Sequence, residues 1–381
     1  MKQKLRKAER RFEMRYLFIN SVYGVRSTGK LIAAKCKELT ENGHECYVAY
    51  GREAVQDEYA TLIQIGTAFD YTLHAAMSMT FDCHGMGSRV ATQRFLRKAE
   101  KLKPDIIWLH NIHGYYLNYE VLFVWLRNHP EVEKRWTLHD CWALTGHCAY
   151  FTMKNCNKWL DQCENCPQLR TYPKCYFADN SKRNYNYKKK CFTSIQNMTL
   201  ITPSAWLKDM VCLSFLNSYP VEVQYNTIDR TVFKPVQSAF KEKYDIAGKF
   251  MVLGVAVGWE ETKGLQDMLQ LRLLLDDRFA MVLVGIPHKK QRMMPSNIIA
   301  IEKTESQSEL VDIYSAADVF VNPTHQDNYP TVNLEARACG TPVITYNVGG
   351  SPESAGHEYV VRENDVQGIK QYILEICKTE E

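Results

Sequence analysis

Two carboxylates, Asp327 and Glu335, have the types and spacing for binding chemistry, with seven residues between them. Asp327 lies in a polar loop, and Glu335 lies about one turn into a helix expected at residues 331–339, which follows Pro330 and ends at Gly340. The unpaired amides at a helix start bind anions, and carboxylates accept hydrogen bonds from hydroxyl groups. The pattern therefore predicts a site for a sugar joined to a diphosphate.

Alternating helices and buried strands must position these two carboxylates. An amphipathic stretch begins near residue 308, a short apolar strand covers 319–321, and a second buried strand covers 343–346. This strand ends before Gly349 and Gly350, where the backbone can bend sharply or come close to a ligand. The order predicts an α/β unit whose ligand site lies at the carboxyl ends of parallel strands.

This stretch resembles a known signature. It resembles the E-x7-E motif of retaining glycosyltransferases with the GT-B fold, the family 4 class, through Asp327-x7-Glu335, Ala336, Cys339-Gly340-Thr341-Pro342-Val343 and Gly349-Gly350-x-x-Glu353. The resemblance implies an α/β protein with two doubly wound, Rossmann-like parallel-sheet domains that face a central cleft. The sequence departs from the motif at its first position, where Asp327 replaces Glu.

The length of 381 residues predicts two domains. A segment at residues 226–235 resembles the N-G-I-D-x-x-x-F-x-P segment at the domain junction of the family, with Thr227 in place of Gly. We therefore expect an acceptor-side domain at residues 14–235, with a cysteine-rich insertion at about 141–175. A donor-side domain is expected at 236–381, and a basic tail at 1–13.

Composition limits the class of protein. The chain is 45% hydrophobic and 24% charged, and no apolar run approaches the ~20 residues that span a bilayer, so we expect a cytoplasmic globular protein. Its net charge of +4 equals that of residues 1–13, so no nucleic-acid-binding surface is expected. Either this tail contacts anionic lipid at the inner face of the cell membrane, or it is a disordered tail, or Met14 is the true start.

The first half offers two further candidates. A strand at 14–20, a glycine-containing loop and a helix from Leu31 form an arrangement that approaches phosphate, and the resemblance matches Gly29 to the loop glycine that faces the donor. A strand near residue 106 leads to His110, which the resemblance places close to the donor sugar. His113 is an additional candidate. Residues 66–87 show no clear periodicity, and we expect a mobile loop there.

The second half offers the cation for the diphosphate. In the family, a G-R-L-x-x-x-K-G segment supplies an Arg and a Lys to the donor; here Lys263 matches the Lys, but Trp259 follows the glycine. Lys263 therefore carries more of the phosphate charge, or another cation assists. The resemblance further implies that the amides of Thr331 and Val332 bind the diphosphate. Glu335 would hold the ribose, Asp327 the sugar hydroxyls, and His110 the sugar near its reacting face.

Thirteen cysteines would stay reduced in a cytoplasmic protein, so a local cluster of them indicates a metal rather than disulfides. The spacing Cys148-x7-Cys156-x6-Cys163-x2-Cys166 suits four thiolates on one structural zinc ion, which leaves no open coordination position for catalysis. The alternative is a loop with buried free thiols. No cofactor is expected for catalysis itself.

These features predict an enzyme: a retaining glycosyltransferase that moves a sugar from a nucleoside-diphosphate sugar to a glycan or lipid-linked acceptor in surface polysaccharide biosynthesis. The cysteine-rich run resembles an insertion in colanic-acid-type and other polysaccharide glycosyltransferases. Two alternatives remain, a sugar-nucleotide 2-epimerase of the same fold and a donor-binding protein without catalysis. The sequence predicts neither the donor base and sugar nor the oligomeric state.

Overall fold

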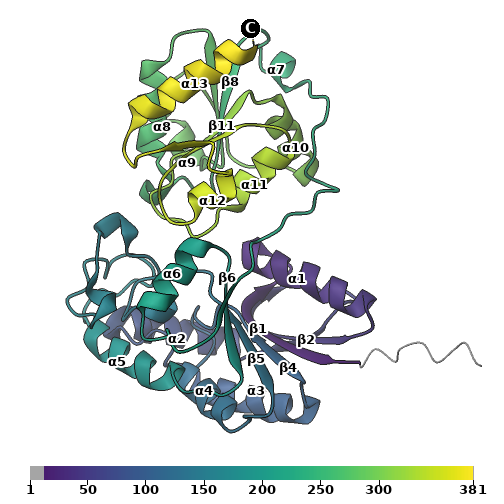
Figure 1. The fold of residues 1–381 in the computed structure, drawn as a ribbon, viewed down its shortest axis with the longest axis vertical. Helices are drawn as coiled ribbons and strands as arrows, with labels where there is room; N and C mark the ends of the chain where they lie inside the picture. Colours follow the sequence, from purple (N-terminus) through teal and green to yellow (C-terminus); the bar gives the residue numbers. More distant parts are fainter. Residues whose placement is uncertain (1–12, 381) are drawn as a thin grey trace, which may run out of the picture. The chain divides into compact units, whose positions relative to one another are not determined.

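The computed structural model describes residues 13–380, which form two compact units (Figure 1). The first unit contains residues up to 203 and 208–224, and the second contains 204–207 and the chain from 225 onward. The basic tail predicted at 1–13 lies, except for Glu13, outside the described residues. Within residues 13–380, no helix combines the length and the hydropathy needed to cross a lipid bilayer.

The first unit is built on a seven-stranded parallel sheet with the order β3-β2-β1-β4-β5-β6-β7. Its strands are β1 (Arg15–Tyr23), β2 (Glu45–Ala54), β3 (Thr61–Gln64), β4 (Ile106–Leu109), β5 (Glu133–Thr137), β6 (Met198–Thr202) and β7 (Val221–Val223). Its helices are α1 (Arg26–Glu41), α2 (Ala68–Phe81), α3 (Arg89–Leu102), α4 (Tyr119–Arg127), α5 (Ser181–Phe192) and α6 (Ala205–Leu213), whose first residues belong to the second unit.

The second unit is built on a six-stranded parallel sheet with the order β10-β9-β8-β11-β12-β13. Its strands are β8 (Phe250–Val255), β9 (Phe279–Val284), β10 (Ile298–Ile301), β11 (Val319–Asn322), β12 (Val343–Tyr346) and β13 (Tyr359–Val361). Its helices are α7 (Phe240–Lys243), α8 (Leu265–Leu274), α9 (His288–Gln291), α10 (Gln307–Ala316), α11 (Thr331–Ala338), α12 (Ser351–Ala355) and α13 (Val366–Glu380). The prediction of two parallel α/β sheets is confirmed.

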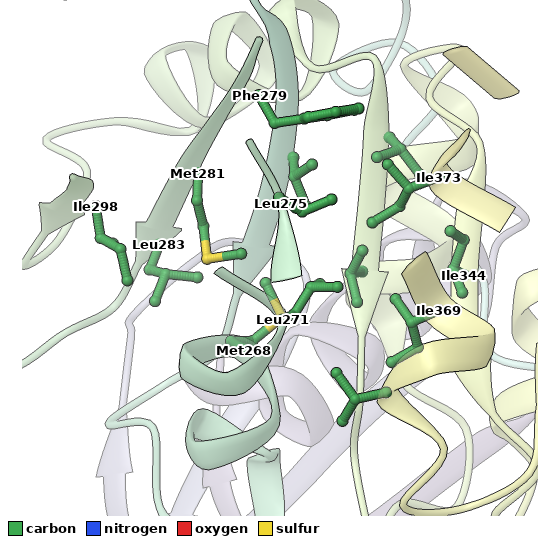
Figure 2. Packing of buried hydrophobic residues seen from close by; sticks show 14 of the residues in the cluster. Met268, Leu271, Leu275, Phe279, Met281, Leu283, Ile298, Ile344, Ile369 and Ile373 are labelled. Atoms are coloured by element: carbon green, nitrogen blue, oxygen red, sulfur yellow. The ribbon is translucent and has the colours of Figure 1, made fainter. Parts of the chain in front are cut away.

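Side-chain alternation along the strands gives the second sheet a core on each face. In β8, Phe250 and Val252 pack on the face covered by α8 and α13, whereas Met251 and Leu253 pack on the face covered by α7, α10 and α11. Figure 2 shows the first of these clusters, in which side chains of α8 and α13 meet those of β9, β10 and β12. Because apolar residues occupy both faces, the strands read as continuous hydrophobic runs.

Two local predictions are wrong. Residues 66–87 contain a helix, α2, rather than a loop: the Thr67 side chain accepts a hydrogen bond from the Asp70 amide, and the Asp70 carboxylate accepts one from the Thr67 amide, which forms a capping box. The helix expected from Leu31 begins at Arg26 instead, so Gly29 lies inside α1 and is buried. A Cβ atom on Gly29 would lie 3.1 Å from Val22, so this glycine lets α1 pack closely on β1.

Candidate functional site

Lys263 and Asp327 lie together in the second unit. Lys263 ends the short 3-10 helix Glu261–Lys263 after β8, and Asp327 lies in the loop between β11 and α11, so both follow carboxyl ends of adjacent strands. Lys263 Nζ donates a hydrogen bond to Asp327 Oδ2 at 2.7 Å. Their side chains are 33% and 20% exposed, so the ion pair remains accessible to a ligand. The cation and the carboxylate predicted to contact the donor are thus direct neighbours.

The start of α11 is suited to an anion. Thr331 and Val332 are its first residues, and Pro330 at the N-cap position makes no side-chain hydrogen bond to them. The first amides of a helix have no partner within it, so they point toward the loop that carries Asp327. One turn further, Glu335 accepts a hydrogen bond from the Tyr314 hydroxyl at 3.1 Å, which fixes its carboxylate against α10.

Gly349 and Gly350 lie directly against the backbone of the loop between β11 and α11. A Cβ on Gly349 would lie 1.9 Å from the Asp327 carbonyl oxygen, and a Cβ on Gly350 would lie 2.0 Å from the Asn328 carbonyl oxygen. Gly349 also has a φ of +57°, which favours glycine. The two glycines therefore let the chain after β12 press against the loop that carries Asp327.

Glu353, the last residue of the sequence motif, binds backbone amides of the protein. Its carboxylate accepts hydrogen bonds from the amides of Ala205 and Trp206 at 2.7 and 2.9 Å, and these residues pack with the second unit. A carboxylate at a helix start offsets the positive end of the helix dipole, so Glu353 stabilises the beginning of α6.

Trp259, at the place where the family has an Arg, is a core residue. It is 1% exposed, and its Nε1 donates to the Val284 carbonyl oxygen at 2.8 Å. A different cation lies at this loop: Lys290 of α9 donates to the Trp259 carbonyl oxygen at 2.6 Å and to that of Gly258 at 3.2 Å. No motif in the sequence indicated Lys290, because it lies 31 residues further along the chain.

Two carboxylates around the buried His325 support the loop after β11. His325 Nε2 lies 2.9 Å from Asp267 Oδ2, and its Nδ1 lies 2.9 Å from Glu363 Oε1. The hydrogen bond to Asp267, joined by that to Glu363, raises the pKa of His325. The His325 amide also donates to the Thr262 carbonyl oxygen at 2.9 Å. This histidine therefore connects the Asp327 loop to the segment that carries Lys263, and the sequence contained no signal for it.

In the first unit, His110 follows β4 and is buried. Its Nδ1 lies 2.9 Å from Nε2 of His139, which follows β5, and its own Nε2 is buried without a hydrogen-bond partner. Burial lowers the pKa of His110 well below its usual value and that of His139 to about 4, so both rings stay neutral near pH 7. His110 therefore offers a neutral ring, not a cation, to a ligand.

His113 joins a second hydrogen-bonded chain nearby. Its Nδ1 lies 3.0 Å from the Tyr172 hydroxyl, and its Nε2 lies 3.0 Å from Asp140 Oδ2, off the line of a well-directed hydrogen bond. Although burial favours the neutral carboxyl, His113 holds the pKa of Asp140 below its usual range. His110, His113, His139 and Asp140 all line one small cavity at the ends of β4 and β5.

The four predicted metal ligands, Cys148, Cys156, Cys163 and Cys166, all line one cavity in the cysteine-rich insertion. A hydrogen bond from Cys148 lowers the pKa of Cys166 to about 7. Within residues 13–380, no three or more His, Cys, Asp or Glu side chains are arranged to hold a metal ion. The structural zinc ion therefore stays a prediction, motivated by the shared cavity.

The second unit matches a known family of domains, and the whole fold matches solved structures. Residues 249–379, most of the second unit, match the profile of the family described as glycosyl transferases group 1. The whole chain is similar to sucrose-phosphate synthase from Thermosynechococcus elongatus, with a TM-score of 0.67 and 14% identity over 96% of this chain and 90% of that one. The protein thus has the GT-B fold of two parallel-sheet α/β domains.

Two proteins of similar sequence are both named as glycosyltransferases. The chain is 25% identical to the Escherichia coli (strain K12) protein WcaC, whose name assigns it to colanic acid biosynthesis as a glycosyl transferase, over 72% of this chain and 68% of that one. It is 33% identical to D-inositol 3-phosphate glycosyltransferase of Streptosporangium roseum over only 34% of each chain. The second unit therefore carries a glycosyl transferases group 1 domain, and the chain as a whole is similar to proteins named as glycosyl transferases.

One structural neighbour contains a nucleotide sugar. Anabaena HepE, in complex with UDP-glucose, has a TM-score of 0.61 and 12% identity to this chain, over 97% of this chain and 91% of that one. At this identity the similarity establishes the shared fold alone. Which nucleotide sugar the present protein binds is therefore a matter for its own site.

Proposed function

We propose that this protein transfers a sugar from a nucleoside-diphosphate sugar to a glycan or lipid-linked acceptor in surface polysaccharide biosynthesis, with retention of anomeric configuration. The observation that carries the proposal is the accessible Lys263–Asp327 pair beside the start of α11, within the matched group 1 domain. The WcaC relative supports the polysaccharide assignment, and the HepE complex supports a nucleotide-sugar donor.

The ion pair suggests how the donor is received. A bound diphosphate competes with Asp327 for Lys263, because it brings more negative charge to the same ammonium group. Lys263 then neutralises the diphosphate, and Asp327 becomes available to accept hydrogen bonds from sugar hydroxyls. The first amides of α11, at Thr331 and Val332, contribute further positive potential to the phosphates.

The same groups favour the bond-breaking step. Cleavage of the bond between sugar and diphosphate places negative charge on the leaving group, and preorganised cations and amides stabilise it. Lys263 and the start of α11 serve this purpose, while Glu335, held by Tyr314, orients the ribose. The leaving phosphate takes the proton of the acceptor hydroxyl, so no side-chain nucleophile is required. We propose further that the reaction takes place at the inner face of the cell membrane, where lipid-linked acceptors are reached by a peripheral enzyme.

Glu335→Gln tests the donor site. The substitution keeps the shape of the side chain and an oxygen for the Tyr314 hydroxyl, but it removes the charge that binds ribose hydroxyls. Nucleotide sugars are first screened by thermal shift, beginning with UDP-glucose, and affinity for the best donor is then measured by calorimetry. We expect Glu335→Gln to weaken donor affinity at least about tenfold, equivalent to about 1.4 kcal/mol. The exposed Glu302→Gln is the matched control.

Product analysis separates the alternatives. Transfer to a glycan or lipid-linked acceptor with the donor's anomeric configuration supports the proposal, and NMR of the product reads that configuration. Interconversion of the nucleotide sugar without an acceptor indicates an epimerase, and binding without turnover indicates a donor-binding protein. Unchanged donor affinity and turnover in Glu335→Gln would contradict the assigned site.

A further inference from the structure

Helix α2 of the first unit buries polar side chains and exposes apolar ones. His74 and Ser78 face the protein interior and are 1% exposed. Phe69, Leu73 and Met77, spaced four residues apart and therefore on one side of the helix, are 75%, 49% and 38% exposed. A surface helix ordinarily turns its apolar side inward. We call the solvent side, Phe69 with Leu73 and Met77, the α2 apolar face.

Hydrogen bonds fix α2 in this orientation. His74 Nε2 accepts from the amides of Gly85 and Gly87 at 3.1 and 3.2 Å, and its Nδ1 lies 3.0 Å from the Ser88 hydroxyl. Burial lowers the pKa of His74 to about 4, so the ring stays neutral and can accept these bonds. A helix rotated to bury Phe69 would leave the two glycine amides without a partner, which is costly inside a protein. The exposure of the apolar face is therefore built into the fold.

A second segment extends this surface. Residues 170–177 run beside the end of α2, since the Tyr176 amide donates to the Met79 carbonyl oxygen at 2.8 Å. Two of its aromatic residues, Tyr176 at 47% and Phe177 at 83%, are exposed, whereas Tyr172, at 43%, turns its hydroxyl inward to His113.

Cations accompany these aromatic rings. Arg170 and Lys174 are both exposed, and the Arg170 guanidinium lies 5.3 Å from the centre of the Tyr176 ring. Residues 170–177 contain no acidic side chain. The segment thus combines exposed aromatic rings with positive charge only, directly beside the end of α2.

We propose that the α2 apolar face and residues 170–177 together dock the protein on a bilayer that contains anionic lipids. An uncharged apolar helix face enters the boundary between headgroups and acyl chains. Tyrosine rings favour the headgroup level, and Lys and Arg bind lipid phosphates. The inference rests on the proposed function, because it names the surface through which a peripheral enzyme reaches a lipid-linked acceptor.

The charge of the surface favours lipid over a second copy of the chain. In a twofold dimer whose axis passes through residues 170–177, Arg170 and Lys174 would meet the same two cations of the other copy, and like charges repel. Anionic headgroups, in contrast, complement both residues. The apolar face alone would serve either partner, and the flanking cations decide between them.

Vesicle flotation of the full-length protein tests the proposal. The probes are vesicles of phosphatidylcholine with and without phosphatidylglycerol. We expect binding to the phosphatidylglycerol vesicles that weakens with added salt, and at least tenfold weaker binding by the double variant Phe69→Ser/Leu73→Ser. Phe177→Ser, in the loop, is expected to weaken binding in the same direction. Leu273→Ser on α8, where the leucine is 83% exposed, is the matched control and should bind like the wild type.

Separate readouts keep the outcomes distinct. These variants retain the basic residues of the chain start, so any loss of binding belongs to the substituted surface. Equal vesicle binding by the wild type and Phe69→Ser/Leu73→Ser overturns the proposal, as does a concentration-dependent dimer that the double variant abolishes without any vesicle binding by the wild type. Nucleotide-sugar binding, measured without vesicles, should be the same in all variants, so a failure of docking is distinguishable from a failure of the proposed transfer activity.

Discussion

Gly349→Ala should damage the second unit much more than an alanine at another glycine of similar backbone shape. Gly349 has a φ of +57°, and its added Cβ would lie 1.9 Å from the Asp327 carbonyl oxygen. Gly248 has a φ of +76°, but a Cβ added there would meet no atom within 4 Å apart from its own chain neighbours. Gly248→Ala is therefore a matched control that carries the backbone strain without the collision.

The magnitudes follow from these two effects. An L-residue in the left-handed region costs about 1–2 kcal/mol, and this applies to both substitutions. Ordinary contact begins at 3.4 Å, so the Asp327 loop must move by more than one ångström in Gly349→Ala. Such overpacking costs about 1–3 kcal/mol more. For an excess of about 2 kcal/mol, a domain of this size should melt about 4–8 °C below the Gly248→Ala protein.

Thermal unfolding of the two full-length variants measures this difference, and calorimetry measures their affinity for the best nucleotide sugar. We expect Gly349→Ala to lose donor affinity as well, because the displaced loop carries Asp327, the partner of Lys263. Gly248→Ala should bind the donor like the wild type. Equal melting temperatures and equal donor affinities in the two variants would refute the reasoning from close packing.

Two other substitutions test the buried His325 and the cysteine cavity. The folded-state pKa of His325 is raised by Asp267 and Glu363, so its contribution to stability is complete below about pH 6.5 and is lost as the pH rises through the raised pKa. His325→Gln should lower the free energy of unfolding by about 2–4 kcal/mol at pH 6 and by less at pH 9, and a difference that is constant with pH would contradict this. The purified protein should contain about one zinc ion per chain by elemental analysis, as four thiolates bind one ion. Cys163→Ser should lose it and the exposed Cys212→Ser should keep it, whereas a wild type free of zinc after growth with zinc would contradict the prediction.

Local pattern predicted the donor-side elements well. The helix expected at 331–339 is α11, Thr331–Ala338, and the strand expected at 343–346 is β12, Val343–Tyr346. The helix prediction succeeded because Pro330 and Gly340 mark helix ends through backbone geometry, which acts within a few residues. The strand prediction succeeded because a short apolar run follows directly. The pattern of buried strands likewise predicted two parallel sheets.

Helix α2 was missed for an equally physical reason. Its solvent side is apolar and its buried side carries His74 and Ser78, so the usual periodicity gave no signal. The Thr67–Asp70 capping box was the one available indication of a helix start. A prediction from hydrophobic periodicity fails where a helix exposes its apolar side chains and buries polar ones.

The sequence by itself determined the α/β fold class and the local elements that carry Asp327 and Glu335, because short motifs and hydrophobic runs depend on neighbours along the chain. Only the tertiary structure decided that Lys263 pairs with Asp327, that Trp259 is a core residue and that Lys290 lies at its carbonyl oxygen. These contacts join residues 31 to 64 positions apart. Crossover connections between the parallel strands bring them together, and the order of those strands depends on the packing of the whole domain rather than on any local spacing.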